Sequence, residues 1–104
     1  IIRTQLLDIS FFPKKTKLTP SGDFMLDLLS NSMIESAGLF YELTVINTIS
    51  DTRLSAQRAK GVERVLLGFG VSKDKFSVGK KENTMGLPTS DNKNYILIKI
   101  TEND

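Results

Sequence analysis

Few residues of this chain could carry out chemistry, because the sequence contains neither histidine nor cysteine. These absences exclude Ser-His-Asp and Cys-His nucleophilic sites, zinc held by His or Cys, redox-active thiols and iron–sulfur ligation. Disulfide bonds are excluded as well, so cysteine usage indicates no compartment. A hydrolase built only from carboxylates is the enzyme class that remains, and it would need specific positive support.

The hydroxyl and basic residues form no catalytic or phosphate-binding motif. Ser55 and Lys60 fall on one predicted helix, at an offset that does not bring them onto the same face. No phosphate-cradling glycine-rich loop follows a strand, and no aromatic-basic ribbon of the single-strand-binding kind occurs. The net charge is +2 and the pI about 9.0, well short of a nucleic-acid-binding arm. Lysines gather over residues 73–81, interrupted by Asp74, which is typical of a solvated mixed-charge surface; contact with an anionic polymer is the alternative.

The length of 104 residues fits a single domain over residues 1–104, and a hydrophobic fraction of 39% is enough for one modest core. No apolar run approaches the ~20 residues that a membrane-spanning helix needs. The chain begins Ile1-Ile2-Arg3, without a methionine or a signal-peptide pattern. We therefore expect a piece of a longer protein, whose targeting signal, lipid anchor or membrane helix would lie outside this sequence.

Local patterns predict a strand, a helix and a second strand in the first half of the chain. Residues 6–12 alternate as a strand does. Thr19 suits the cap of a helix and Pro20 its first position, and Gly38 is expected to end it. The apolar stripe of this helix consists of Met25, Leu28, Leu29 and Met33. Residues 39–47 are apolar on both faces, which is typical of a central strand covered on both sides.

The second half begins with a helix over residues 52–69, capped by Asp51 or Ser50. Its buried stripe consists of Leu54, Val62, Val65, Leu66 and Phe69. Gly61 lies in mid-helix, where it costs up to ~1 kcal/mol relative to alanine, and close packing on the sheet would explain it. Residues 75–79 and 94–100 are strand candidates, separated by a long polar loop over residues 80–93 and followed by a polar tail over residues 101–104.

The resulting order, β-α-β-α-β-β, predicts an α+β domain in which each helix follows a strand and covers one sheet face. The last two strands are expected to pair antiparallel around the long loop. The aromatic residues are expected in the core rather than on a binding platform; these are Phe11, Phe12, Phe24, Phe40 and Phe69.

Three segments together resemble the OmpA/MotB C-terminal domain family. Residues 9–12 (ISFF) and 16–22 (TKLTPSG) are similar to its opening strand and its "a-L-x-p-x-g" helix entry. Residues 54–71 match its "L-S-x-x-R-A-x-x-V-x-x-x-L-x-x-x-G-V" helix, which is the most specific of the three motifs. Val78-Gly79, Pro88, Asn92 and residues 95–100 resemble its "G-x-G-e-x-x-P … N-R-R-V-x-I" ending. The resemblance spans nearly the whole chain.

This resemblance implies an OmpA-like β-α-β-α-β-β sandwich, with a mixed four-stranded sheet and helices packed on one side. It also implies a non-enzymatic module in the periplasm of a Gram-negative bacterium, with outer-membrane association as an option. Such a module binds peptidoglycan non-covalently and anchors a larger assembly. Its partners would be peptidoglycan and other envelope-complex proteins, without nucleic acid, and no cofactor or metal is implied.

In the family, an Asp after the second strand and the Arg of the helix motif grip the diaminopimelate of the peptide stem. A carboxylate beside a guanidinium suits the amine and carboxylate at the free end of that residue. Arg58 matches the family Arg, and the family's "G-H-T-D" falls near residues 47–50, with Asp51 one residue later. The expected ligand-binding residues are therefore Arg58, Asp51, Ser50, Asn47 and Thr48.

Each of these residues also has a structural interpretation. Arg58 could form a salt bridge with a tertiary partner, while Asp51 and Ser50 suit the cap of the second helix. The sequence places Ser50 at the acidic position, shortens the following loop, and has Asn94-Tyr95-Ile96 where the family has "N-R-R". The alternative is therefore a degenerate relative that has lost peptidoglycan binding. It would serve as a protein-contact component of an envelope-spanning complex, such as a secretion system or a flagellar motor.

Overall fold

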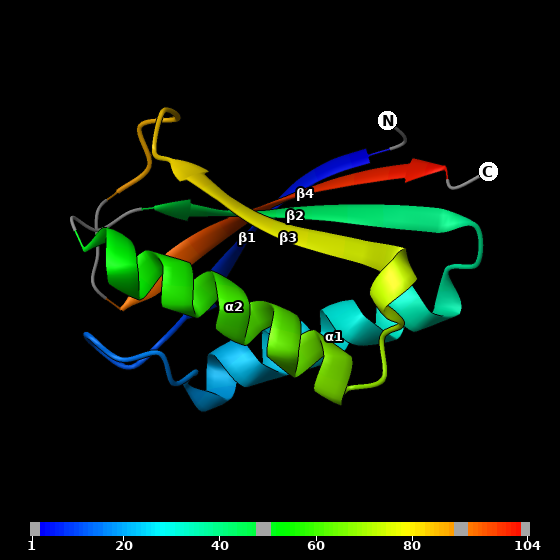
Figure 1. Ribbon diagram of the computed structural model, residues 1–104, viewed down its shortest axis with the longest axis horizontal. Coiled ribbons are helices and arrows are strands. Elements are labelled where there is room, and N and C mark those ends of the chain that lie inside the picture. The colour runs from blue at the N-terminus through cyan, green and yellow to red at the C-terminus, as the bar shows by residue number, and fades with distance from the viewer. Residues whose placement is uncertain (1–2, 48–50, 89–91, 103–104) are drawn as a thin grey trace.

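The computed structural model describes residues 3–47, 51–88 and 92–102. Within them the elements are β1 (Arg3–Ser10), α1 (Pro20–Glu35), β2 (Leu39–Asn47), α2 (Thr52–Gly68), the 3-10 helix η1 (Lys73–Lys75), β3 (Phe76–Glu82) and β4 (Lys93–Glu102). The strands form one mixed sheet, and α1 and α2 pack against the same face of it (Figure 1). The predicted α+β class, element order and one-sided packing of the helices are confirmed.

The strand order is β1-β4-β2-β3, so the last strand of the chain lies inside the sheet. β4 runs antiparallel to both of its neighbours, with Ile96 opposite Leu7 and Ile98 opposite Leu43. β3 pairs parallel with the other edge of β2. The predicted antiparallel pair between the last two strands is therefore wrong. An interior position lets the alternate isoleucines of β4 pack under both helices, which an edge position beside β3 would not allow.

β2 is central, as predicted, but its two faces differ. Tyr41, Leu43 and Val45 are buried under the helices. On the opposite face Glu42 is exposed, whereas Ile46 is buried. The expected cover on both sides is thus wrong for most of the strand, because both helices pack on one face.

α1 begins as its sequence predicts and buries a shifted stripe. The Thr19 hydroxyl accepts a hydrogen bond from the Gly22 amide (3.1 Å), with Pro20 in the first turn. Beyond the helix, Gly38 turns the chain with φ of +77°. The buried positions are Gly22, Leu26, Leu29, Ser30 and Met33. The predicted stripe holds for Leu29 and Met33, whereas Leu28 is 47% exposed. Apolar residues cover too wide an arc of this helix for spacing alone to select the buried side.

α2 is capped by Asp51, whose carboxylate accepts a hydrogen bond from the Leu54 amide (3.0 Å). Its buried positions are Leu54, Ser55, Arg58, Ala59, Val62 and Leu66. Of the predicted stripe, Val65 and Phe69 are only half-buried. A Cβ added at Gly61 would meet no atom within 4 Å, so the close-packing interpretation of this glycine is wrong.

The core lies between the sheet and the helix pair. It includes Ile9, Leu26, Leu43, Val62, Leu66, Ile96 and Ile98. Of the five phenylalanines expected there, Phe11 is buried, and Phe40 and Phe69 are half-buried. Phe12 and Phe24 are exposed by 40% and 59%, so the prediction is wrong for these two. Neither described helix combines the length and the apolar character needed to cross a membrane.

Candidate functional site

Several chain segments converge at one end of the sheet. β1, β2 and β3 run in one direction and β4 runs in the other. The ends of the first three strands, the start of β4 and the first turns of both helices therefore gather at the same end, on the left of Figure 1. The residues expected to bind a ligand come from the end of β2 and the start of α2, so the topology places them here.

Arg58 is the largest fully buried side chain of the described residues, with 0% exposure. Its Nε donates a hydrogen bond to the Lys15 carbonyl (2.9 Å), and Nη1 donates one to Asn94 Oδ1 (2.8 Å). A third and longer contact joins Nη2 to the Phe12 carbonyl (3.4 Å). The guanidinium also lies 4.5 Å from the centroid of the Phe11 ring, within the range of a cation–π contact.

Asn94 is a site residue that the sequence patterns did not predict. Its side chain is fully buried, and its Nδ2 donates a hydrogen bond to the Ile46 carbonyl (3.1 Å) while its Oδ1 accepts from Arg58. Asn94 thus connects α2 to the end of β2. Strand alternation could have indicated its burial, because Asn94 shares a face with Ile96, Ile98 and Ile100.

The segment from Phe11 to Leu18, which we call the Phe12 loop, closes one side of the site. Phe11 and Leu18 form an antiparallel bridge. The Phe12 amide donates to the Lys17 carbonyl (3.0 Å), and the Lys15 amide donates to the Phe12 carbonyl (3.0 Å). Lys14 takes a positive φ of 59° at the turn. The loop therefore has a defined backbone. Arg58 contacts the loop through the main-chain carbonyls of Phe12 and Lys15.

The predicted ligand-binding residues are in different environments. Asp51 is exposed and caps α2, and no ion pair joins its carboxylate to Arg58 in the described part of the chain. Asn47 is half-buried at the end of β2. Thr48 and Ser50 lie outside the described residues.

A hollow of about 300 Å³ opens beside the start of α2. Its lining residues are Asn47, Thr52, Ser55, Lys80, Lys81 and Glu82. Arg58, one of the expected ligand-binding residues, is not among them. The Ser55 hydroxyl is buried and has no hydrogen-bond partner among the described residues. Across residues 3–47, 51–88 and 92–102, no cluster of three His, Cys, Asp or Glu side chains could hold a metal ion.

Solved structures with the same arrangement of elements are MotB and OmpA-like domains. The C-terminal domain of Helicobacter pylori MotB superposes with a TM-score of 0.71 and 16% identity, covering 93% of this chain and 85% of that one. This protein has the OmpA/MotB-like fold. The OmpA-like domain of FopA1 from Francisella tularensis gives a TM-score of 0.66 and 20% identity, over 95% of this chain and 73% of that one. An outer membrane protein from Borrelia burgdorferi gives 0.68 and 15%, over 90% and 85%.

No protein-family model and no curated protein matches this OmpA-like chain. The likeness is therefore one of fold, at low sequence identity. Within that fold, the segment resembling "L-S-x-x-R-A" forms the first turns of α2, and Arg58 faces inward from it toward Asn94 and the Phe12 loop.

Proposed function

We propose that this protein is a non-enzymatic domain of the bacterial cell envelope that binds peptidoglycan non-covalently and anchors a larger assembly. The OmpA/MotB-like fold, which it shares with MotB and FopA1 domains, supports this proposal. So does the resemblance of α2 to the helix that carries the ligand-gripping Arg in the family. A Gram-negative periplasmic location, with other envelope proteins as partners, belongs to the same proposal.

The observation that carries the proposal is the place of Arg58. The helix that resembles the family motif sets it at the end of the sheet where β2 ends and α2 begins. Bonds from its Nε and Nη1, at 2.9 and 2.8 Å, orient the guanidinium. A stem-peptide carboxylate that reaches the guanidinium at this end would form a charge-assisted bond with it.

Polar residues beside the end of β2 would complete the site. The exposed Asp51 carboxylate uses one oxygen as a helix cap and has a second oxygen for the amine of diaminopimelate. Asn47, Thr48 and Ser50 are proposed to hydrogen-bond the peptide stem. All of these groups come from the segment that joins β2 to α2.

Sedimentation with insoluble peptidoglycan sacculi tests the proposal. We expect the wild-type protein to sediment and free meso-diaminopimelate to compete, whereas lysine, which lacks the second carboxylate, competes weakly. Arg58→Lys should reduce binding because an ammonium cannot reproduce the planar set of donors. Arg53→Ala, on the exposed side of the first turn of α2, is the matched control and should bind normally. Circular dichroism identifies variants that do not fold. Wild-type protein that stays in the supernatant would refute peptidoglycan binding.

One observation favours the alternative, a domain that keeps the fold and acts as a protein-contact component of an envelope complex. The Arg58 guanidinium has no exposed surface and donates hydrogen bonds to its own chain. For this function, Arg58 would act only by holding the Phe12 loop against α2 and β4. Absence of sedimentation with sacculi, together with crosslinking of the domain to other envelope proteins in cells, would support it.

A further inference from the structure

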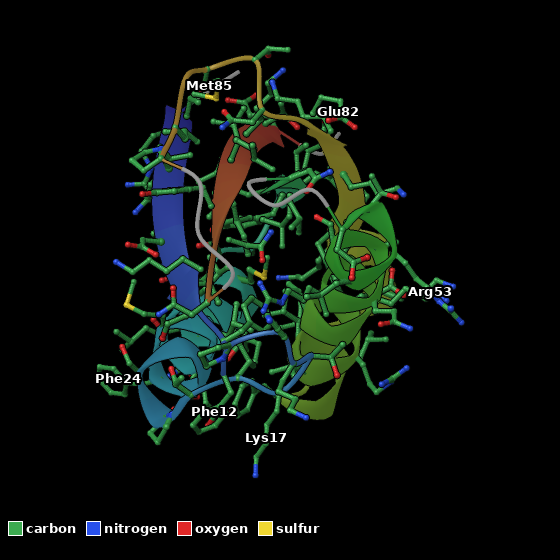
Figure 2. All side chains as sticks on the ribbon, turned by 90° about the vertical axis from the view of Figure 1, so that its left-hand side faces the viewer. Phe12, Lys17, Phe24, Arg53, Glu82 and Met85 are labelled. Carbon is green, nitrogen blue, oxygen red and sulfur yellow. The ribbon has the colours of Figure 1, made fainter. Side chains whose placement is uncertain are left out.

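Two exposed phenylalanines lie at one end of the helix layer, on the side away from the sheet. Phe12 belongs to the Phe12 loop and Phe24 to the first turns of α1 (Figure 2). They are 40% and 59% exposed. Phe12 lines an open hollow of about 550 Å³ together with Pro20 and Asp23, the residue before Phe24. Leu28, one turn further along α1, is also 47% exposed. These apolar side chains therefore project from the surface instead of packing into the core.

Basic side chains lie beside Phe12. Lys14, Lys15 and Lys17 are exposed on the Phe12 loop, and Lys17 Nζ lies 5.9 Å from the centroid of the Phe12 ring. The basic surface continues onto α2, because Thr16 of the loop lines a second hollow with Lys60 and Arg64. The acidic residues of this area are the exposed Asp23 and the half-buried Asp27, on either side of Phe24 in α1. Positive charge therefore predominates around Phe12 and toward α2.

We propose that this surface binds the face of a lipid bilayer that contains anionic lipids. Lysines near such a face are attracted to its negative potential, and exposed Phe and Leu side chains enter the boundary between headgroups and acyl chains. Phe12 projects among the lysines of its own loop, and Phe24 and Leu28 project separately from α1. Insertion into an interface suits this arrangement, since it requires no complementary protein surface. The inference goes beyond peptidoglycan binding and does not depend on it.

The buried Arg58 gives the surface a fixed shape. It holds the carbonyls of Phe12 and Lys15, the residues whose side chains would enter the interface and contact the headgroups. The loop therefore loses little conformational freedom on binding, which favours affinity.

Sedimentation with lipid vesicles tests the proposal. The complete chain should sediment with vesicles of phosphatidylcholine and phosphatidylglycerol but not with phosphatidylcholine alone, and added salt should release it. The triple variant Lys14→Gln, Lys15→Gln, Lys17→Gln should lower the partition constant by roughly a hundredfold, or about fivefold per lysine. Phe12→Ser with Phe24→Ser should lower it by at least roughly tenfold.

Two matched controls lie away from this surface. Met85→Ser removes a comparably exposed apolar side chain, on the opposite side of the molecule in Figure 2, and should leave binding unchanged. Lys73→Gln removes an exposed lysine from η1 and should have a small effect.

Fluorescence gives a second readout, because the chain has no tryptophan. The emission of a Phe24→Trp variant should shift to the blue on anionic vesicles and be quenched by brominated acyl chains. Either of two results would overturn the proposal. The first is wild-type protein that does not sediment with anionic vesicles. The second is sedimentation of the Phe24→Trp variant without any change in its emission. That result would indicate that this surface does not enter the bilayer and that an acidic protein is its partner instead.

Discussion

At the scale of single residues, Arg58 determines how one end of the molecule is held together. Its guanidinium joins α2 to the Phe12 loop and, through Asn94, to β4 and the end of β2. A buried cation is tolerated because hydrogen bonds replace the water it loses. Arg58 also lies four residues from both Leu54 and Val62, within the apolar stripe of α2, so its sequence position already indicated an inward-facing side chain.

We expect Arg58→Ala to destabilise the protein by about 3 kcal/mol, since two main-chain carbonyls and the Asn94 amide oxygen lose a charged donor in a buried place. Urea denaturation followed by circular dichroism measures this change. Arg64→Ala, an exposed arginine of the same helix, is the control and should change stability by less than about 0.5 kcal/mol. Equal effects of the two substitutions would contradict the structural role of Arg58.

At the scale of elements, the helix starts are specified by residues with distinct local roles. Thr19 caps α1 and Asp51 caps α2. Gly22 has a further role, because a Cβ at this position would lie 2.3 Å from the Ser10 carbonyl oxygen. The first turn of α1 therefore touches the end of β1 directly, and the glycine permits that contact.

Gly22→Ala should destabilise the protein by about 2 kcal/mol, because the backbone of β1 cannot move away cheaply. Gly61→Ala is the matched control, since an added Cβ there meets no atom within 4 Å. It should stabilise the protein by about 0.5–1 kcal/mol through helix propensity. Thermal unfolding of both variants measures the difference, and a neutral Gly22→Ala would show that α1 can shift along β1.

Asp51→Ala should cost about 1 kcal/mol of stability, because the Leu54 amide loses its cap. Asp51→Asn retains the capping oxygen and should be nearly neutral. The pair also separates the two proposed roles of this residue, since Asp51→Asn should weaken the binding of diaminopimelate while leaving stability unchanged. A loss of stability equal to that of the alanine variant would indicate that the charge, rather than the hydrogen bond, supports the helix.

At the scale of the whole molecule, β4 completes the sheet between β1 and β2. Its two faces are unequal, because both helices cover one of them. Ile96, Ile98 and Ile100 face the helices and are buried, whereas Leu97 on the other face is half-buried. The last strand of the chain thus supplies the middle of the core.

Ile98→Ala should destabilise the protein by about 3 kcal/mol, through lost burial and a cavity beneath the helices. Leu97→Ala, its neighbour on the open face, should cost about 1 kcal/mol, because less apolar surface is removed from water there. Chemical denaturation of the two variants measures the contrast. Similar losses would mean that something covers the open face of the sheet in solution.

The local sequence determined much of this protein. Patterns within a few residues predicted four features that the structure confirms. These are the cap at Thr19, the limits of β2, the second helix after Asp51 and the β-α-β-α-β-β order. The resemblance carried by residues 54–71 also indicated the fold correctly. Hydrogen bonds within one turn and the alternation of side chains explain this success, because they depend on near neighbours alone.

Only the tertiary structure decided which neighbours the elements acquired. The place of β4 beside β1 and β2, rather than beside β3, depends on contacts between distant parts of the chain. The same is true of the hydrogen-bond partners of Arg58 and Asn94 and of the exposure of Phe12, Phe24 and Leu28. The type of a side chain sets the free energy of burying it, but the packing of two helices on one sheet face sets the volume of the core. In this protein the buried side chains include Arg58, which holds the Phe12 loop, whereas Phe12 and Phe24 remain exposed.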